Sequence, residues 1–140
     1  MNAKLSTARR AKLLLRAMSP EEKFWQLFMV SSDPLRDRAA FAHGAYGVQL
    51  LDLRDPHLPV PSRRMAAAVA DSVQRFFVER TRLGIPAIIF EEGVHGLMQG
   101  GATVFPQAVG LAATWDTALV GEVARAIARQ SRERGVRQLL

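Results

Sequence analysis

Two adjacent glutamates stand at the end of an apolar run, in the segment IIFEEGVHG that covers residues 88–96. Paired carboxylates can act as nucleophile and acid on one glycosidic bond when their carboxyl groups lie about 5 to 5.5 Å apart. Neighbouring side chains of an extended segment point in opposite directions, so Glu91 and Glu92 are poorly placed to share one bond. We therefore expect one carboxylate to enter a site while the other makes structural hydrogen bonds.

A metal site is the second chemistry that this segment could support. Glu92 and His95 stand three residues apart, a spacing that brings two ligands together on a helix, and di-metal bundles need two such pairs with further carboxylates. Here the pair occurs once, at the end of an expected strand, and glycines surround it. We expect no metal site, and we expect the His95 ring to hydrogen-bond nearby backbone and so fix the loop.

Four glycines in this region do not match a phosphate-binding motif. Their spacing is neither G-x-G-x-x-G nor G-x-x-x-x-G-K-[ST], and no helix opens directly after them. A G-x-S-x-G nucleophile elbow does not occur either. We predict that these glycines let the backbone turn sharply and approach a ligand closely, and we expect no cofactor. They are Gly93, Gly96, Gly100 and Gly101.

The elements that must position these residues alternate along the chain. Apolar runs bounded by glycine and proline predict buried strands, and apolar residues at three- and four-residue steps predict helices. Strands joined through helices run parallel, so we expect an α/β chain with its chemistry at the carboxyl ends of the strands. The expected strands cover residues 46–53, 85–90 and 136–140, and the expected helices cover about 6–17, 62–82 and 117–134, with another starting at residue 20.

The predicted helices carry signals at their ends and apolar stripes along one side. Ser19 and Glu22 form a Ser-x-x-Glu capping box, with Pro20 at the first helical position. Asp116 can cap the last helix, and Gly135 follows its end. We expect Leu13 and Leu14 of the first stripe to face inward. The other stripes are Phe24, Leu27 and Phe28; Met65, Val69, Val73, Phe76 and Phe77; and Leu119, Val120, Val123, Ile127 and Ala128.

Composition narrows the class of protein. The 140 residues are 49% hydrophobic and contain no cysteine, which permits a core and excludes disulfides and thiolate metal sites. The apolar runs are shorter than the roughly 18 residues of a membrane span, and the basic N-terminus lacks a signal-peptide core. We therefore expect a cytoplasmic protein without a membrane partner. The net charge of +6 is spread over predicted helices, so we expect no specific nucleic-acid partner, only weak salt-dependent association.

Three separated blocks resemble glycoside hydrolase family 3, the family of β-glucosidases, β-xylosidases and related exo-acting enzymes. The blocks are MSPEEKFWQLFMV, GIPAIIFEEGVHGLMQGGATVFPQAVGLAATWD and ARAIARQSRERGV. They agree with the family in order and spacing over about residues 6–140, nearly the whole chain. The resemblance implies that residues 1–140 hold the first strand–helix units of a (β/α)8 TIM-type barrel, the N-terminal part of a catalytic domain and incomplete by itself.

The resemblance also implies a role for Glu92. The acidic residue that the family has at this position binds sugar hydroxyls in the subsite next to the cleaved bond, and in many members it is an aspartate. A carboxylate can accept hydrogen bonds from two adjacent hydroxyls, and such charge-assisted bonds are strong. The expected ligand is a small β-linked sugar or oligosaccharide.

The family's other working parts have no counterpart in this sequence. A DPRWGR-like segment, a Lys-His pair and the SDW-like segment with the nucleophilic aspartate are absent from residues 1–140. We therefore expect no catalytic residue in the chain and no glycoside hydrolysis by it alone. Three interpretations follow: the N-terminal portion of a retaining β-glycosidase, a non-catalytic fragment or half that pairs with a separately encoded C-terminal part, and a nucleic-acid-binding protein.

Overall fold

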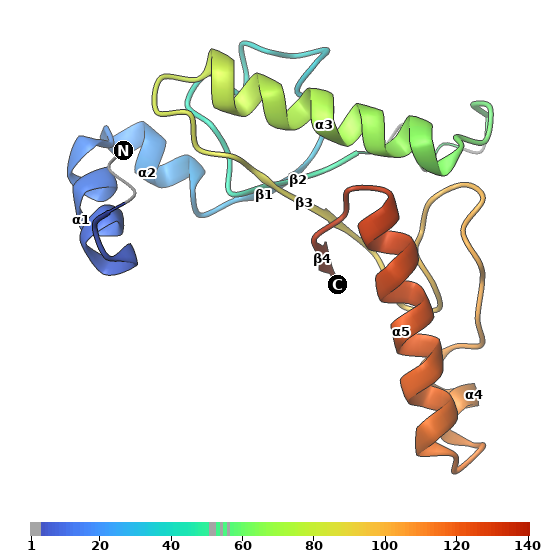
Figure 1. Cartoon of the computed structure of the whole chain (residues 1–140). Coiled ribbons are helices and arrows are strands. Elements are labelled where there is room, and N and C mark those ends of the chain that lie inside the picture. Colours follow the sequence, from blue (N-terminus) through green and yellow to red (C-terminus); the bar gives the residue numbers. More distant parts are fainter. Residues whose placement is uncertain (1–3, 51–52, 54, 56) are drawn as a thin grey trace.

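A computed structural model describes residues 4–50, 53, 55 and 57–140, arranged as Figure 1 shows. Four strands form one sheet in the order β1-β2-β3-β4, and every neighbouring pair is parallel. The predicted α/β class with a parallel sheet is therefore confirmed. The strands are β1 (Met29–Ser31), β2 (Gly47–Gln49), β3 (Ile88–Glu91) and β4 (Gln138–Leu139).

The described residues also form five helices. α3 connects β2 to β3, and α4 and α5 lie between β3 and β4, as crossovers between parallel strands require. In the described part of the chain, no helix has the length and apolar character needed to span a lipid bilayer. The helices are α1 (Thr7–Ala17), α2 (Pro20–Trp25), α3 (Arg63–Arg80), α4 (Ala108–Ala112) and α5 (Thr117–Glu133).

Two short elements were not predicted from the sequence. β1 precedes the first expected strand and pairs in register with β2, with Val30 opposite Val48. α4 lies inside the expected glycine-rich loop, and no side chain caps its start. Both elements are shorter than the stretch over which a hydrophobic period can be recognised, so the expected element order lacked one strand and one helix.

The predicted helix ends are confirmed. Ser19 Oγ accepts from the Glu22 amide at 3.2 Å, and the Glu22 carboxylate accepts from the Ser19 amide at 2.8 Å, so both halves of the capping box are present. Asp116 Oδ1 accepts from the Leu119 amide at 2.9 Å where α5 begins. Gly135 follows α5 with a φ of 82°, a conformation that glycine adopts without strain.

The core lies between α3 and one face of the sheet. Val48 of β2, Ile89 of β3, and Val73 and Phe77 of α3 are almost completely buried. Phe41, from the connection between β1 and β2, packs edge-on against Phe77 with ring centroids 5.9 Å apart. This cluster fixes β2 and β3, the strands that lead to the candidate site.

The stripe expected on α3 is wrong at its start. Met65 is 60% exposed, whereas Ala66 and Ala70 are buried. Small side chains allow a helix backbone to approach the sheet closely, so the alanines occupy the contact and the larger methionine lies beside it. The prediction relied on the size of the apolar side chains and did not account for which side of the helix faces the sheet.

The stripes of the other helices face no core in the described residues. α1 and α4 have no buried residue, and α5 buries only Ser131. The expectation that Leu13 faces inward is wrong, and Leu27 is 78% exposed. Figure 1 shows why: α1 and α2 lie at one end of the sheet, and most of α5 runs away from it. The periodicity predicted these helices correctly but not what would cover them.

The face of the sheet opposite α3, here called the inner face, is concave. A Cβ on Gly47 would lie 3.4 Å from Phe90 Cδ1 and 3.5 Å from Met29 Cγ, so these residues share one face. Gln138 Nε2 lies 3.9 Å from Met29 Sδ, which joins the two outer strands across two others. Because neighbouring strands lie roughly 4.8 Å apart, this contact indicates strong curvature. Alternation and register assign to the inner face Met29, Ser31, Gly47, Gln49, Phe90 and Gln138.

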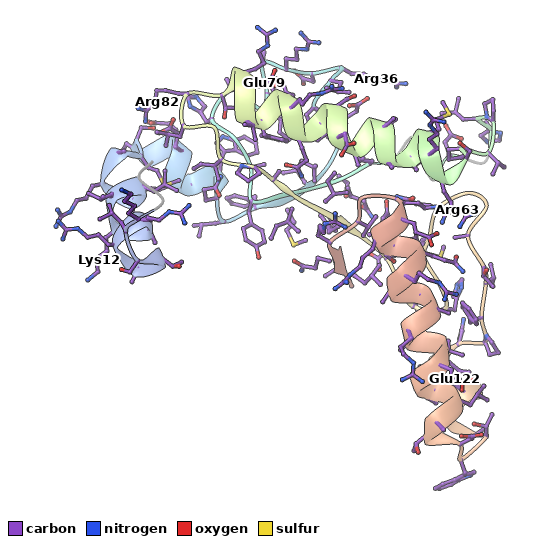
Figure 2. The ribbon with its side chains drawn as sticks, viewed as in Figure 1. Lys12, Arg36, Arg63, Glu79, Arg82 and Glu122 are labelled. Carbon is purple, nitrogen blue, oxygen red and sulfur yellow. The ribbon has the colours of Figure 1, made fainter. Side chains whose placement is uncertain are left out.

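An ion pair ties α2 to the segment that follows α3. Arg82 donates to both carboxylate oxygens of Glu22, from Nε to Oε1 at 2.9 Å, and to the Ala17 carbonyl at 2.8 Å. Figure 2 shows Arg82 beside α2. The hydrogen bonds from Arg82 and from the Ser19 amide hold the pKa of the Glu22 carboxyl below its usual value, against the opposing effect of burial.

Candidate functional site

Glu91 and Glu92 lie at the carboxyl end of β3, the edge at which parallel α/β folds carry their chemistry. Backbone hydrogen bonds between this segment and the segment that contains β4 continue past the end of β3. The Leu140 amide donates to the Glu91 carbonyl and the Gly93 amide donates to the Leu140 carbonyl, both at 2.9 Å. The backbone is therefore held extended through Glu92, and both glutamates stand where the sequence placed them.

Glu92 belongs to the inner face. Side chains alternate along an extended chain, so Glu92 shares the face of Phe90, two residues before it. Its side chain is half-buried, and its backbone carbonyl accepts from the Met98 amide at 3.0 Å. A carboxylate in this place can accept hydrogen bonds from a ligand on the concave side of the sheet. Contact with a sugar hydroxyl stays a prediction for this residue.

Glu91 is fully buried and makes the structural hydrogen bonds expected of one of the two glutamates. Gln49 donates from Nε2 to Glu91 Oε2 at 3.2 Å, and the Glu92 amide donates to the same oxygen at 3.2 Å. Ser31 Oγ donates to Gln49 Oε1 at 2.7 Å. A row of polar groups thus runs from β1 through β2 to the end of β3.

The loop after Glu92 folds back on itself through close backbone contacts. The Phe105 amide donates to the His95 carbonyl at 2.7 Å. Gly96 has a φ of 120°, and a Cβ there would lie 2.3 Å from the Thr103 carbonyl oxygen. Only glycine fits this approach. The predicted sharp turning is confirmed at Gly96 and at Gly101, which has a φ of 72°, while close approach of these glycines to a ligand remains a prediction.

The expectation for the His95 ring is wrong at Nδ1. This atom is buried and has no hydrogen-bond partner in the described part of the chain. The loop is fixed instead by the His95 carbonyl, because the chain reversal brings the amide of Phe105 to it. Among the described residues, no group of three or more His, Cys, Asp or Glu side chains could hold a metal ion.

α5 holds the far end of this loop. Thr103 and Gln130 exchange two hydrogen bonds of 2.9 Å, from the Thr103 amide to Oε1 and from Nε2 to Thr103 Oγ1. Arg134 is buried and donates to the Gly101 carbonyl at 3.0 Å. Burial, and secondarily the nearby Arg63 guanidinium, lower the pKa of Arg134 below its usual value. The arginine therefore serves the loop as a buried hydrogen-bond donor.

A cavity of about 610 Å³ opens beside this anchor, between the start of α3 and the end of α5. Arg63 donates to Glu133 Oε2 at 2.9 Å across it, and Figure 2 marks Arg63 at the start of α3. Arg129 and Arg134 also line it, but Glu92 does not. The cavity therefore lies apart from the mouth of β3.

Sequence reasoning missed the residues that support Glu92. Gln49 is a polar residue between Val48 and Leu50 of the expected strand, and that contrast was the available signal. Ser31 ends a strand that was not recognised, so its place beside Gln49 could not be inferred. Arg134 stands at the end of a predicted helix that is rich in arginine, a place that predicts exposure to solvent, whereas the residue is 3% exposed.

Comparison with known proteins identifies relatives. Residues 21–140 match the family model described as the N-terminal domain of glycosyl hydrolase family 3. A β-xylosidase from Formosa agariphila is 43% identical over 60 residues, covering 39% of this chain and 8% of that protein. A putative β-xylosidase from the same organism is 28% identical over 146 residues, covering 96% of this chain and 19% of that protein.

A solved structure agrees with this assignment. A β-glucosidase from Erythrobacter marinus superposes with a TM-score of 0.78 at 34% identity, covering 98% of this chain and 18% of that one. The chain thus spans less than a fifth of the length of each of these relatives. Together with the curved parallel sheet, the matches show the predicted fold, the first strand–helix units of a (β/α)8 TIM-type barrel.

Proposed function

Because the chain belongs to glycosyl hydrolase family 3, we propose that it contributes part of the sugar-binding end of the active site of a retaining, exo-acting β-glycosidase. The xylosidase and glucosidase names of its relatives suggest a β-xyloside or a β-glucoside as the substrate. The role of this segment is to hold the sugar, while the bond is broken by groups from elsewhere.

The observation that carries this proposal is the place of Glu92. It follows β3 directly, on the concave inner face, and its backbone is held on both sides by hydrogen bonds. A carboxylate there can accept from two adjacent hydroxyls of one sugar ring, and such bonds can strengthen as the transition state forms. Uncharged amides or hydroxyls would bind the same hydroxyls more weakly.

We further propose that residues 1–140 do not hydrolyse glycosides alone. The segments that carry the nucleophile in the family have no counterpart in this sequence. Glu91 cannot replace them, because it is fully buried and already accepts from Gln49 and from the Glu92 amide. The nucleophile and the acid/base would then come from other polypeptide.

The test is an assay of the purified chain with aryl β-xylosides and aryl β-glucosides, together with direct measurement of methyl β-xyloside binding. We expect no turnover above buffer, and binding that is lost in Glu92→Ala but kept in Glu122→Gln, which changes an exposed carboxylate on α5. Equal sugar binding by the wild type and Glu92→Ala would contradict the role of Glu92. Turnover in both proteins would contradict the assignment of catalysis to other polypeptide.

A second candidate function is a half that pairs with a separately encoded C-terminal part. It is supported by large exposed apolar side chains on α2 and α5, including Phe24 and Val120, and by outer strands β1 and β4 that each pair on one side within the described residues. Such edges and faces invite further chain to pack on them. Co-expression with the remaining barrel of a relative tests this pairing, with a stable complex as the expected result.

A further inference from the structure

We infer that Glu91 is a positioning residue that sets the backbone of Glu92 and thereby the direction in which the Glu92 carboxylate meets a sugar. The inference rests on the proposed function, because it assigns a purpose to the second glutamate of the pair. Glu91 is fully buried, so it touches no ligand itself. Its effect on the Glu92 carboxylate passes through the backbone amide of Glu92.

Burial of a carboxylate is costly, and such a group is retained where hydrogen bonds compensate for the lost water. One oxygen of Glu91 receives two donors, Gln49 Nε2 and the Glu92 amide, each at 3.2 Å. A leucine of similar size would fill the same space without this cost. The carboxylate therefore contributes something that packing alone does not provide.

The direction of the polar row follows from its chemistry. A carboxylate oxygen accepts hydrogen bonds, so it selects the orientation of the Gln49 amide in which Nε2 points at Glu91. Oε1 then faces β1, where Ser31 Oγ donates to it at 2.7 Å. Side chains from β1 and β2 are thereby oriented by one acceptor at the end of β3. All hydrogen bonds of this row run in one direction, with Ser31 as the first donor and Glu91 as the final acceptor.

The same oxygen fixes one end of Glu92. The amide of Glu92 is held by Glu91 Oε2, and its carbonyl accepts from the Met98 amide at 3.0 Å. With both peptide groups anchored, the Cα–Cβ bond of Glu92 has one direction. A binding group must be held within about 0.5 Å of its working position, so the loss of one anchor reduces affinity without removing the group.

The direct test is amide hydrogen exchange at Glu92 in the full chain, which requires no sugar. Glu91→Leu removes the acceptor and keeps the volume, so we expect the protection of the Glu92 amide to fall by about fivefold to tenfold. Glu91→Gln keeps an acceptor oxygen, so protection should return to within about twofold of wild type. Glu122→Gln on α5 should change nothing. Unaltered protection in Glu91→Leu would overturn the inference.

A milder variant guards against loss of the fold in Glu91→Leu. Ser31 is exposed, and Ser31→Ala removes only the first donor of the row. We expect it to fold normally and to lower the protection of the Glu92 amide by about twofold, because Gln49 loses the bond that orients it. If Ser31→Ala folds and keeps wild-type protection of the Glu92 amide, and Glu91→Leu also has no effect on it, then the polar row contributes only packing and the inference fails.

The sugar readout separates this inference from the proposed function. Binding of methyl β-xyloside should weaken about fivefold in Glu91→Leu and recover in Glu91→Gln. In the Glu92→Ala background, Glu91→Leu should cause no further loss, because Glu91 acts through Glu92. If Glu92→Ala binds as tightly as wild type, the proposed function fails while the exchange experiment still decides the inference. If the two losses simply add, Glu91 has a separate structural role and the inference fails.

Discussion

Two helices of nearly equal length, α3 with 18 residues and α5 with 17, differ sharply in what they bury. α3 lies along the sheet and buries five side chains, among them Val73 and Phe77. α5 carries an equally regular stripe, yet Ser131 near its end is the one side chain it buries in the described chain. Figure 1 shows α3 over the sheet and α5 extending from it.

The difference teaches that an amphipathic pattern predicts a helix and the side it will bury, but the burial itself depends on a partner. β2 and β3 offer α3 a finished surface, so its stripe forms a core. Most of the α5 stripe, including Leu119 and Val120, stays exposed. The stability of the chain should therefore be concentrated in the unit formed by β2, α3 and β3, and should be low in the arm formed by α4 and α5.

The largest expected effect is that of Phe77→Ala. Phe77 is fully buried and packs against Phe41 and Phe76, with ring centroids 5.9 and 5.2 Å away. Its truncation should lower the free energy of unfolding by about 3 to 5 kcal/mol, as large-to-small changes in a core do. Urea denaturation followed by circular dichroism measures this loss.

The matched change in the arm is Val120→Ala, which removes apolar atoms from an exposed stripe. Surface changes of this kind stay within about 0.5 kcal/mol. A loss comparable to that of Phe77→Ala would mean that α5 packs against something in solution, such as a second copy of the chain. The two regions would then no longer differ.

The same contrast explains how far the sequence could predict the fold. Continuous apolar runs and capping signals suffice for β3, α3 and α5, because each is long or carries a marked end. β1 has three residues, and its existence depends on the edge that β2 presents to it. Met65 and Ala66 show a related limit, since the residue that touches the sheet is chosen by backbone approach rather than by hydrophobicity.

For the candidate site, the sequence predicted the position of Glu92 and the separate structural role of Glu91. Partners of Glu91 could not be predicted, because Gln49 and Ser31 become neighbours only through the register of three strands. Arg134 is a similar case. Its position at the end of a basic helix predicts a side chain exposed to solvent, whereas the fold places the Gly101 carbonyl beside it.

An intermediate effect is expected at the junction between the two regions. Gly135 has a φ of 82°, and a Cβ there would lie 2.5 Å from the Ala70 Cβ of α3. Gly135→Ala should therefore lower the free energy of unfolding by roughly 1 to 3 kcal/mol, through strain and overpacking. The measurement is again urea denaturation.

The same substitution at Gly121 is expected to raise the free energy of unfolding instead of lowering it. It lies inside α5, and a Cβ there would meet only the flexible Arg125 side chain, at 3.5 Å or more. Gly121→Ala should stabilise α5 by up to about 1 kcal/mol, which is the difference in helix propensity between glycine and alanine. If both alanine variants were destabilised alike, the arm would be as tightly packed as the junction.

The smallest expected effect lies at the turn before α5. Trp115 is 93% exposed and has a φ of 56°, a left-handed conformation that is unfavourable for any residue with a Cβ. Trp115→Gly removes this strain but adds freedom to the unfolded chain, and the two terms nearly cancel, each about 1 kcal/mol. Trp115→Ala keeps the strain without the added freedom, so by the same cancellation the two variants should agree in the free energy of unfolding to within about 0.5 kcal/mol in urea denaturation. A glycine variant less stable than the alanine variant by about 1 kcal/mol would mean that this turn is not held left-handed in solution, and the start of the arm would then be more loosely defined than its cap at Asp116 indicates.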